Sequence, residues 1–282
     1  MINISGKRAV ITGAASGFGR SLALALADRG CRIGIADINV EGALATLEMV
    51  EKRKGSGEVY RLDVVKPEEV EAMADHFFKS WGGVDLLVNN AGVAVVGIVG
   101  EIPLENWKRV IDINFWGMVY GCHSFIPRMK AQGSGYILNM ASAAGLLSMM
   151  EMAPYNTSKA AVISLSETLK TELAPHGIGV TVLCPMFFKT NLHESMTYTN
   201  AFEESLSRVC FDQATMSSDQ VAEAAIQAVQ REKLYCVPQL SGRTHWYQKR
   251  LSPSLYYGQM SLLNRRGWAR PLLLWLGRHG LM

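Results

Sequence analysis

The segment KRAVITGAASGFG, residues 7–19, joins a short apolar run to a turn that contains three glycines. Leu22 and Leu26 follow at the spacing of one helix face, and Gly30 ends the pattern. The glycines therefore lie between a predicted strand and a predicted helix, where they let a ligand approach the unpaired N–H groups of the helix N-terminus. This context predicts a turn that binds a pyrophosphate. A plain tight turn is the alternative, because the spacing departs from G-x-G-x-x-G.

Strand and helix patterns alternate along residues 7–237. The predicted strands are Lys7–Ile11, Cys31–Ala36, Val59–Leu62, Val84–Val88, Tyr136–Met140, Val180–Cys184 and Leu234–Val237. Beyond the helix that ends at Gly30, the predicted helices are Val40–Lys52, Pro67–Trp81, Pro103 to about Lys130 with a bend near Gly117–Gly121, Pro154–Pro175 and one from Ser218. This alternation predicts an α/β fold with a Rossmann-like, doubly wound parallel sheet of about seven strands and helices on both faces.

Composition indicates a soluble globular chain with one main domain. Of the 282 residues, 49% are hydrophobic and 19% are charged, and the net charge of +3 is too small to argue for a nucleic-acid partner. We expect the main domain to cover residues 1–240, with a C-terminal extension over 241–282. That extension is rich in aromatic residues and contains seven Lys or Arg residues and no acidic residue.

The cysteines and histidines predict neither disulfides nor a metal site. The five cysteines are odd in number, include no Cys-x-x-Cys, and suit a reducing compartment, and the six histidines show no metal-ligand spacing. No signal peptide precedes the first predicted strand, and no apolar run is long enough to cross a bilayer. We therefore expect a cytoplasmic protein.

Asp37 ends the second predicted strand, about twenty residues beyond the glycine turn. A carboxylate at that place hydrogen-bonds an adenosine ribose 2′-hydroxyl and repels a 2′-phosphate. No compensating cation is expected beside it, because Ser16 is neutral and Ile38 follows directly. The sequence therefore favours NAD over NADP, with a simple turn residue as the alternative role for Asp37.

Tyr155 and Lys159 are four residues apart in a predicted helix, so they share one helix face. A neighbouring ammonium favours an ionised phenol and lowers its pKa, which makes the tyrosine usable as a general acid/base near neutral pH. A Tyr-x-x-x-Lys pair is common by chance, and a solvated pair is the alternative when nothing else supports it.

Several further motifs, taken in order, resemble those of the short-chain dehydrogenase/reductase family in its single-domain branch. TGAASGFG at residues 12–19 resembles the TGxxxGxG loop, and NNAG at residues 89–92 resembles the motif that closes the fourth strand. The resemblance covers about residues 5–237. The remaining matches are Asp63, which corresponds to the acid that contacts the adenine, and the catalytic tetrad Asn114, Ser142, Tyr155 and Lys159.

The resemblance implies a role for each member of the tetrad. Tyr155 exchanges a proton with the substrate oxygen, and Ser142 hydrogen-bonds that oxygen. Lys159 stabilises the phenolate and holds the nicotinamide ribose, while Asn114 holds a water that links Lys159 to solvent. The cofactor-binding residues that it implies are Gly13, Ser16, Gly17, Phe18, Gly19, Asp37, Ile38, Asp63, Val64, Asn90, Ala91, Gly92, Tyr155, Lys159, Pro185, Phe188 and Thr190.

One position departs from the family pattern. Pro185 is followed by Met186 where the family usually has glycine, although Thr190 matches the later threonine beside the carboxamide. Methionine does not readily adopt positive φ, so the path of this loop is expected to differ.

Two apolar segments predict a substrate pocket. In the family the region after the sixth strand, here residues 186–216, closes over the substrate, and methionines adapt to irregular apolar ligands. The expected substrate is a small hydrophobic molecule with a bulky apolar body, such as a steroid, terpenoid, aromatic or long-chain alcohol or ketone. Packing in the core or at an interface is the alternative role for the predicted lining residues, which are Leu146, Leu147, Met149, Met150, Met152, Phe187, Phe188, Leu192, Met196, Tyr198 and Phe202.

The sequence therefore predicts an NAD-dependent oxidoreductase that interconverts a secondary alcohol and a ketone. A non-catalytic dinucleotide sensor or scaffold with the same fold, and an NADPH-dependent ketone reductase, are the alternatives. The resemblance implies a homodimer or homotetramer. For residues 241–282, packing on the same or a neighbouring subunit is favoured over contact with an anionic membrane surface.

Overall fold

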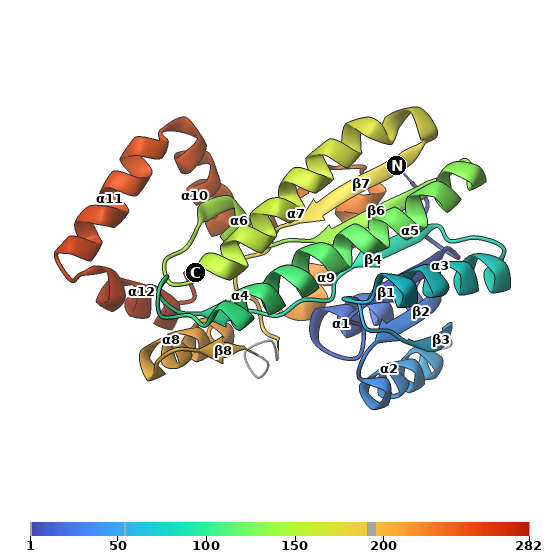
Figure 1. The fold of residues 1–282 in the computed structure, drawn as a ribbon, viewed down its shortest axis with the longest axis horizontal. Coiled ribbons are helices and arrows are strands. Elements are labelled where there is room, and N and C mark those ends of the chain that lie inside the picture. Colours follow the sequence, from blue (N-terminus) through green and yellow to red (C-terminus); the bar gives the residue numbers. More distant parts are fainter. Residues whose placement is uncertain (1, 54, 191–195, 282) are drawn as a thin grey trace.

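Seven parallel strands form the central sheet, in the order β3-β2-β1-β4-β6-β7-β9 (Figure 1). The computed structural model describes residues 2–53, 55–190 and 196–281. The predicted doubly wound parallel sheet is confirmed. The strands are β1 (Arg8–Thr12), β2 (Arg32–Asp37), β3 (Ser56–Arg61), β4 (Leu86–Asn89), β6 (Gly135–Met140), β7 (Ile178–Leu183) and β9 (Tyr235–Cys236).

The helices mostly begin and end near the predicted residues, and α2 and α3 do so at the predicted residues themselves. Those of the main domain are α1 (Gly17–Ala27), α2 (Val40–Lys52), α3 (Pro67–Trp81), α4 (Leu104–Ile111), α5 (Gly117–Gln132), α6 (Ala143–Leu147), α7 (Ala153–Glu172), α8 (Ala201–Asp212) and α9 (Ser218–Gln230).

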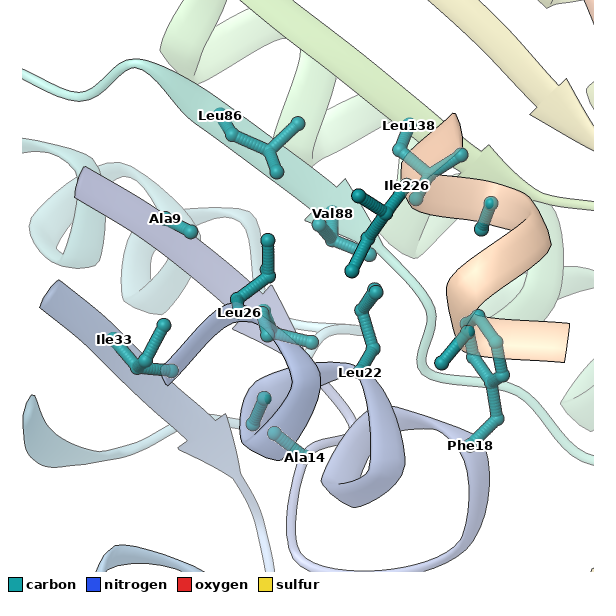
Figure 2. Packing of buried hydrophobic residues seen from close by; sticks show 14 of the residues in the cluster. Ala9, Ala14, Phe18, Leu22, Leu26, Ile33, Leu86, Val88, Leu138 and Ile226 are labelled. Carbon is teal, nitrogen blue, oxygen red and sulfur yellow. The ribbon is translucent and has the colours of Figure 1, made fainter. Parts of the chain in front are cut away.

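Helices cover both faces of the sheet because side chains of each strand alternate between the faces. Ala9 and Ile11 of β1 pack in a cluster with α1 and α9, whereas Val10 packs in a second cluster with α3 and α5. Figure 2 shows the first cluster, in which Leu22 of α1 points towards Ile226 of α9 on the same face of the sheet. Both faces of the strands are apolar, as a doubly covered parallel sheet requires.

The long helix predicted from Pro103 to about Lys130 is present, since residues 104–132 are helical without a break, but its irregularity differs from the predicted bend. A π-helical turn, Asp112–Trp116, separates α4 from α5, so the irregularity lies just before the glycines at which a bend was predicted. Asn114 lies within this turn and is fully buried. Single π-helical turns inside α-helices are frequent at functional sites.

The region after β7 contains regular secondary structure. It contains strand β8 (Thr197–Tyr198), which pairs in parallel with β5 (Val95–Val96), and then helix α8. Leu192, predicted to line the pocket, lies outside the described residues.

Residues 240–281, here named the C-terminal arm, fold into α10 (Leu240–Leu251), α11 (Pro253–Arg265) and α12 (Ala269–Arg278). In Figure 1 the arm forms an arch at one end of the molecule. The first and last helices of the arm pack on the same chain, α10 against α6 and α12 against α8. Across the described part of the chain, no helix combines the length and apolarity needed to cross a membrane.

Candidate active site

A cavity of about 570 Å³ lies at the carboxyl ends of the central strands, where the strand order reverses between β1 and β4. Ligands of open α/β sheets bind at this place. Every predicted catalytic and cofactor-binding residue lines the cavity except Asn114. The lining also includes residues that were not predicted, namely Ala36, Leu62, Val93, Ala94, Ile113, Met140, Ala141, Ala143, Ala144, Met186 and Phe211.

The glycine turn has no room for side chains at its three glycines. Gly13 and Gly17 have φ of +67° and +52°, a region that favours glycine. A Cβ at Gly19 would lie 2.2 Å from the Gly13 carbonyl oxygen, so the turn tolerates no side chain there. Ser16 caps α1 without a side-chain hydrogen bond, and the first turn of α1 carries no acidic residue. Free N–H groups and the positive end of the helix dipole therefore open on the cavity, and this fits a pyrophosphate.

The Asn90 side chain hydrogen-bonds this turn and so joins it to the end of β4. Its side-chain Nδ2 donates to the carbonyl oxygens of Thr12 and Gly13, both at 2.9 Å. The Thr12 hydroxyl in turn accepts from the backbone N–H groups of Asn90 and Ala91. These bonds show that Asn90 shapes the glycine turn, and the adjoining Ala91 and Gly92 form the cavity wall.

Two acidic side chains mark the other end of the cavity, and the backbone holds both in place. Asp37 accepts hydrogen bonds from the backbone N–H groups of Ala15 and Asn39, each at 2.9 Å. Asp63 accepts from the N–H of Val65 at 3.2 Å. Two carboxylates with fixed orientation beside an anion-binding turn fit the ribose and adenine of a dinucleotide.

Ser142, Tyr155 and Lys159 meet at the end of β6, as predicted. Ser142 caps α6, and its Oγ accepts from the N–H of Ala144. Tyr155 lies in the first turn of α7, and the Lys159 ammonium lies 5.6 Å from the centre of its ring. The Lys159 Nζ also donates to the carbonyl oxygen of Met140 at 2.9 Å.

The prediction that the Tyr155 pKa is lowered is wrong. Burial raises the pKa of Tyr155 to about 12, although a hydrogen bond from Ser142 opposes the rise. Burial also lowers the pKa of Lys159 from 10.5 to about 8. Desolvation disfavours the charged form of both groups and is the largest cause of both shifts.

Asn114 does not line the cavity, and its side chain already has partners. Its Oδ1 accepts from the N–H of Val93 at 2.8 Å, and its Nδ2 donates to the Val93 carbonyl oxygen and to Ser158 Oγ. Asn114 therefore fixes the loop after β4 against α7. These bonds use both donors of the side-chain amide and one lone pair of its oxygen, so only one acceptor position is left for the water that the resemblance implied.

In the loop after β7, the residue at the position where the family usually has glycine has ordinary backbone torsions. Met186 is buried and does not have positive φ, and its N–H donates to Gln239 Oε1 at 3.0 Å. Gln239 also donates to the carbonyl oxygen of Phe187. Phe188 packs edge-on against Phe18 of α1, with ring centres 6.1 Å apart. The role of Gln239 carried no sequence signal, because it depends on a contact between distant segments.

One end of the cavity is apolar, and some of the residues predicted to line a substrate pocket lie there. Met149 and Met152 form one side, whereas Phe187, Met196 and Phe211 come from the region after β7. The predictions for five other residues are wrong, because these do not line the cavity, namely Leu146, Leu147, Met150, Tyr198 and Phe202. Leu146 and Leu147 are instead buried in a separate apolar cluster.

Comparisons with known proteins agree with this geometry. The family model described as short chain dehydrogenase matches residues 7–201. The chain is 34% identical to a cyclohexanol dehydrogenase of Acinetobacter over 66% of this chain and 74% of that protein. It is 35% identical to a D-threitol dehydrogenase of Mycolicibacterium smegmatis over 67% of this chain and 73% of that protein. A short chain dehydrogenase/reductase from Burkholderia phymatum, solved in complex with NAD, superposes with a TM-score of 0.85 at 32% identity, over 90% of this chain and 96% of that one.

Proposed function

This chain belongs to the short-chain dehydrogenase/reductase family, and from that membership we propose that it is an NAD-dependent enzyme that interconverts a secondary alcohol and a ketone. Its place among the oxidoreductases of the family follows from the comparisons. The observation that carries the finer proposal is the meeting of Ser142, Tyr155 and Lys159 in one cavity with an anion-binding turn and Asp37.

The proposed chemistry assigns proton transfer to Tyr155. During oxidation its phenolate accepts the proton of the substrate hydroxyl, and during reduction its phenol returns a proton to the substrate oxygen. Ser142 hydrogen-bonds the same oxygen and stabilises charge that develops on it. Lys159 places a cation beside the phenolate. When bound, NAD supplies the hydride acceptor and a positive charge that favours a nearby phenolate.

The apolar lining supports a substrate with a bulky apolar body. Met149, Met152 and Phe187 offer no charged group to a phosphate or carboxylate. The two alcohol dehydrogenases above are named for alcohols of very different polarity, cyclohexanol and D-threitol. Family membership alone therefore does not distinguish an apolar substrate from a polar one. The side chains at the substrate end favour the apolar alternative.

A panel of alcohols tests the proposal. Cyclohexanol, a long-chain secondary alcohol, a hydroxysteroid and threitol are offered with NAD⁺ or NADP⁺, and formation of the reduced cofactor is followed by absorbance. We expect turnover with NAD⁺ and an apolar alcohol. Binding of NAD without turnover of any alcohol or corresponding ketone would favour the sensor or scaffold alternative. A homodimer or homotetramer remains part of the proposal, and light scattering measures it on the same sample.

Asp37→Asn is expected to reduce the preference for NAD over NADP. The change removes the charge that repels a 2′-phosphate and retains a similar side-chain shape. The neighbouring Ile38 is 60% exposed, so a 2′-phosphate at this place would face solvent. The ratio of the NADP to the NAD dissociation constant should fall by at least about tenfold, because a charged hydrogen bond is replaced by a neutral one. Calorimetric titration with both cofactors measures the ratio. An unchanged ratio would contradict the role of Asp37.

A further inference from the structure

Each helix of the C-terminal arm places one polar side chain on the same short stretch of the main domain. This stretch, residues 146–152, is named the wall segment because Met149 and Met152 line the substrate end of the cavity. Lys249 of α10 donates to the carbonyl oxygen of Leu146 at 2.6 Å. Tyr257 of α11 donates to the carbonyl oxygen of Leu147 at 3.5 Å, the weakest of the three contacts.

Arg270 of α12 makes the strongest of these contacts. Its Nε and Nη2 donate to Glu151 Oε1 at 3.1 and 2.9 Å. The Glu151 side chain is only 18% exposed, and the Arg270 side chain is 43% exposed. Charge-assisted hydrogen bonds to a guanidinium are among the stronger polar contacts, and partial burial protects this pair from screening by salt.

The wall segment has a conformation that needs support from outside. Ser148 and Glu151 have φ of +55° and +61°, which is uncommon for residues other than glycine. Bonds within the main domain also hold the segment. Asn156 Nδ2 donates to the Met149 carbonyl oxygen and the Gly97 N–H to the Glu151 carbonyl oxygen, both at 2.6 Å, and backbone bonds join Ser148 to Ala144 and Asn156 to Met152. The segment also ends directly before α7, which carries Tyr155. Its position therefore bears on the shape of the site.

Arg270 contacts a second part of the substrate pocket. Its guanidinium lies 4.9 Å from the ring centre of Phe202 in α8. The same helix carries Phe211, which lines the cavity and packs edge-on against Phe187 with ring centres 5.1 Å apart. Arg270 thus joins the wall segment to the helix that borders the cavity after β7. The cavity lining in the described residues includes none from the arm, so Arg270 acts only through its neighbours.

We propose that Arg270 is a positioning residue, through which the C-terminal arm holds the wall segment and α8 in the arrangement that accepts a bulky apolar substrate. This inference rests on the proposed function for its kinetic consequence, but its structural part does not. The loss of Arg270 should loosen the wall segment without altering the glycine turn or Asp37. The KM for bulky alcohols should then change, whereas the affinity for NAD should not.

Hydrogen exchange in the full-length, unliganded protein tests the structural part. Arg270→Met removes the guanidinium, and Arg278→Met, an exposed position on the same helix, is the matched control. Exchange at the amides of Gly97 and Ser148 should become about tenfold faster in Arg270→Met than in Arg278→Met, as expected when an ion pair with two hydrogen bonds no longer restrains local opening. Glu151→Gln removes the same ion pair from the other side and should give a similar increase.

The kinetic part uses the same variants. With the bulkiest alcohol that the wild type oxidises, the KM of Arg270→Met should rise about tenfold while the NAD dissociation constant stays within about twofold. Equal exchange in Arg270→Met and Arg278→Met would overturn the inference, even in a protein that turns over alcohols. Faster exchange in a protein that oxidises no alcohol would support the contact of Arg270 with the wall segment and would refute the proposed function instead.

Discussion

Tyr155→Phe should lower kcat by about 100- to 10,000-fold, the range that a positioned general acid/base contributes. The variant keeps the aromatic ring that lines the cavity and removes only the hydroxyl that exchanges a proton with the substrate. Lys159 does not replace it, because its Nζ is bonded to the carbonyl oxygen of Met140. Steady-state oxidation of the best alcohol in the panel measures the loss.

The matched control is Tyr257→Phe, which removes a tyrosine hydroxyl in the C-terminal arm, outside the cavity lining. It should keep kcat within about threefold of the wild type, because its weak contact positions only one end of the wall segment. Both variants should bind NADH with a dissociation constant near that of the wild type. A Tyr155→Phe variant with wild-type kcat would remove Tyr155 from the chemistry.

Lys159→Met should change how the free energy of unfolding depends on pH. The pKa of Lys159 is lowered from 10.5 to about 8 by burial, a difference that corresponds to about 3 kcal/mol. Below pH 8 the folded and unfolded states both bind the proton, so the folded wild type bears the full cost of a buried charge. As pH rises from about 8 towards 10.5, the unfolded state keeps a proton that the folded state has released, and wild-type stability rises.

Methionine has no titrating group, so the variant lacks this gain. Between about pH 7 and about pH 10, the wild type should gain about 2 kcal/mol relative to Lys159→Met. Urea unfolding of both proteins at each pH gives the difference. The lost bond to the Met140 carbonyl oxygen adds an offset that is the same at every pH and cancels from the slope. Parallel pH profiles for the two proteins would show that Lys159 is not desolvated as the structure describes.

The sheet and much of the site were predictable because their signals are local. The apolar run before Gly13 and the helical spacing of Leu22 and Leu26 define a strand and a helix without reference to the rest of the chain. Parallel pairing then brings the ends of β1, β4 and β6 together, so the glycine turn, Asn90 and Ser142 have to meet.

Features that depend on contacts between distant residues were not predictable. The π-helical turn at Asn114 coincides with bonds to Val93, twenty-one residues earlier in the chain. The pKa of Tyr155 is governed by burial, which no spacing to Lys159 reveals. Arg270 lies 119 residues from Glu151, and the sequence around it shows only that the C-terminal arm is basic. Such contacts are selected by packing, which periodicity does not encode.

Transfer of deuterium tests the central claim most directly. The wild type is incubated with NAD⁺ and an apolar secondary alcohol that carries deuterium on its carbinol carbon, and the reduced cofactor is examined by mass spectrometry. The account predicts one deuterium on C4 of the nicotinamide ring with the wild type, and initial labelling at least about 100-fold slower with Tyr155→Phe. An unlabelled cofactor from the wild type, or equal labelling by the two proteins, would contradict it.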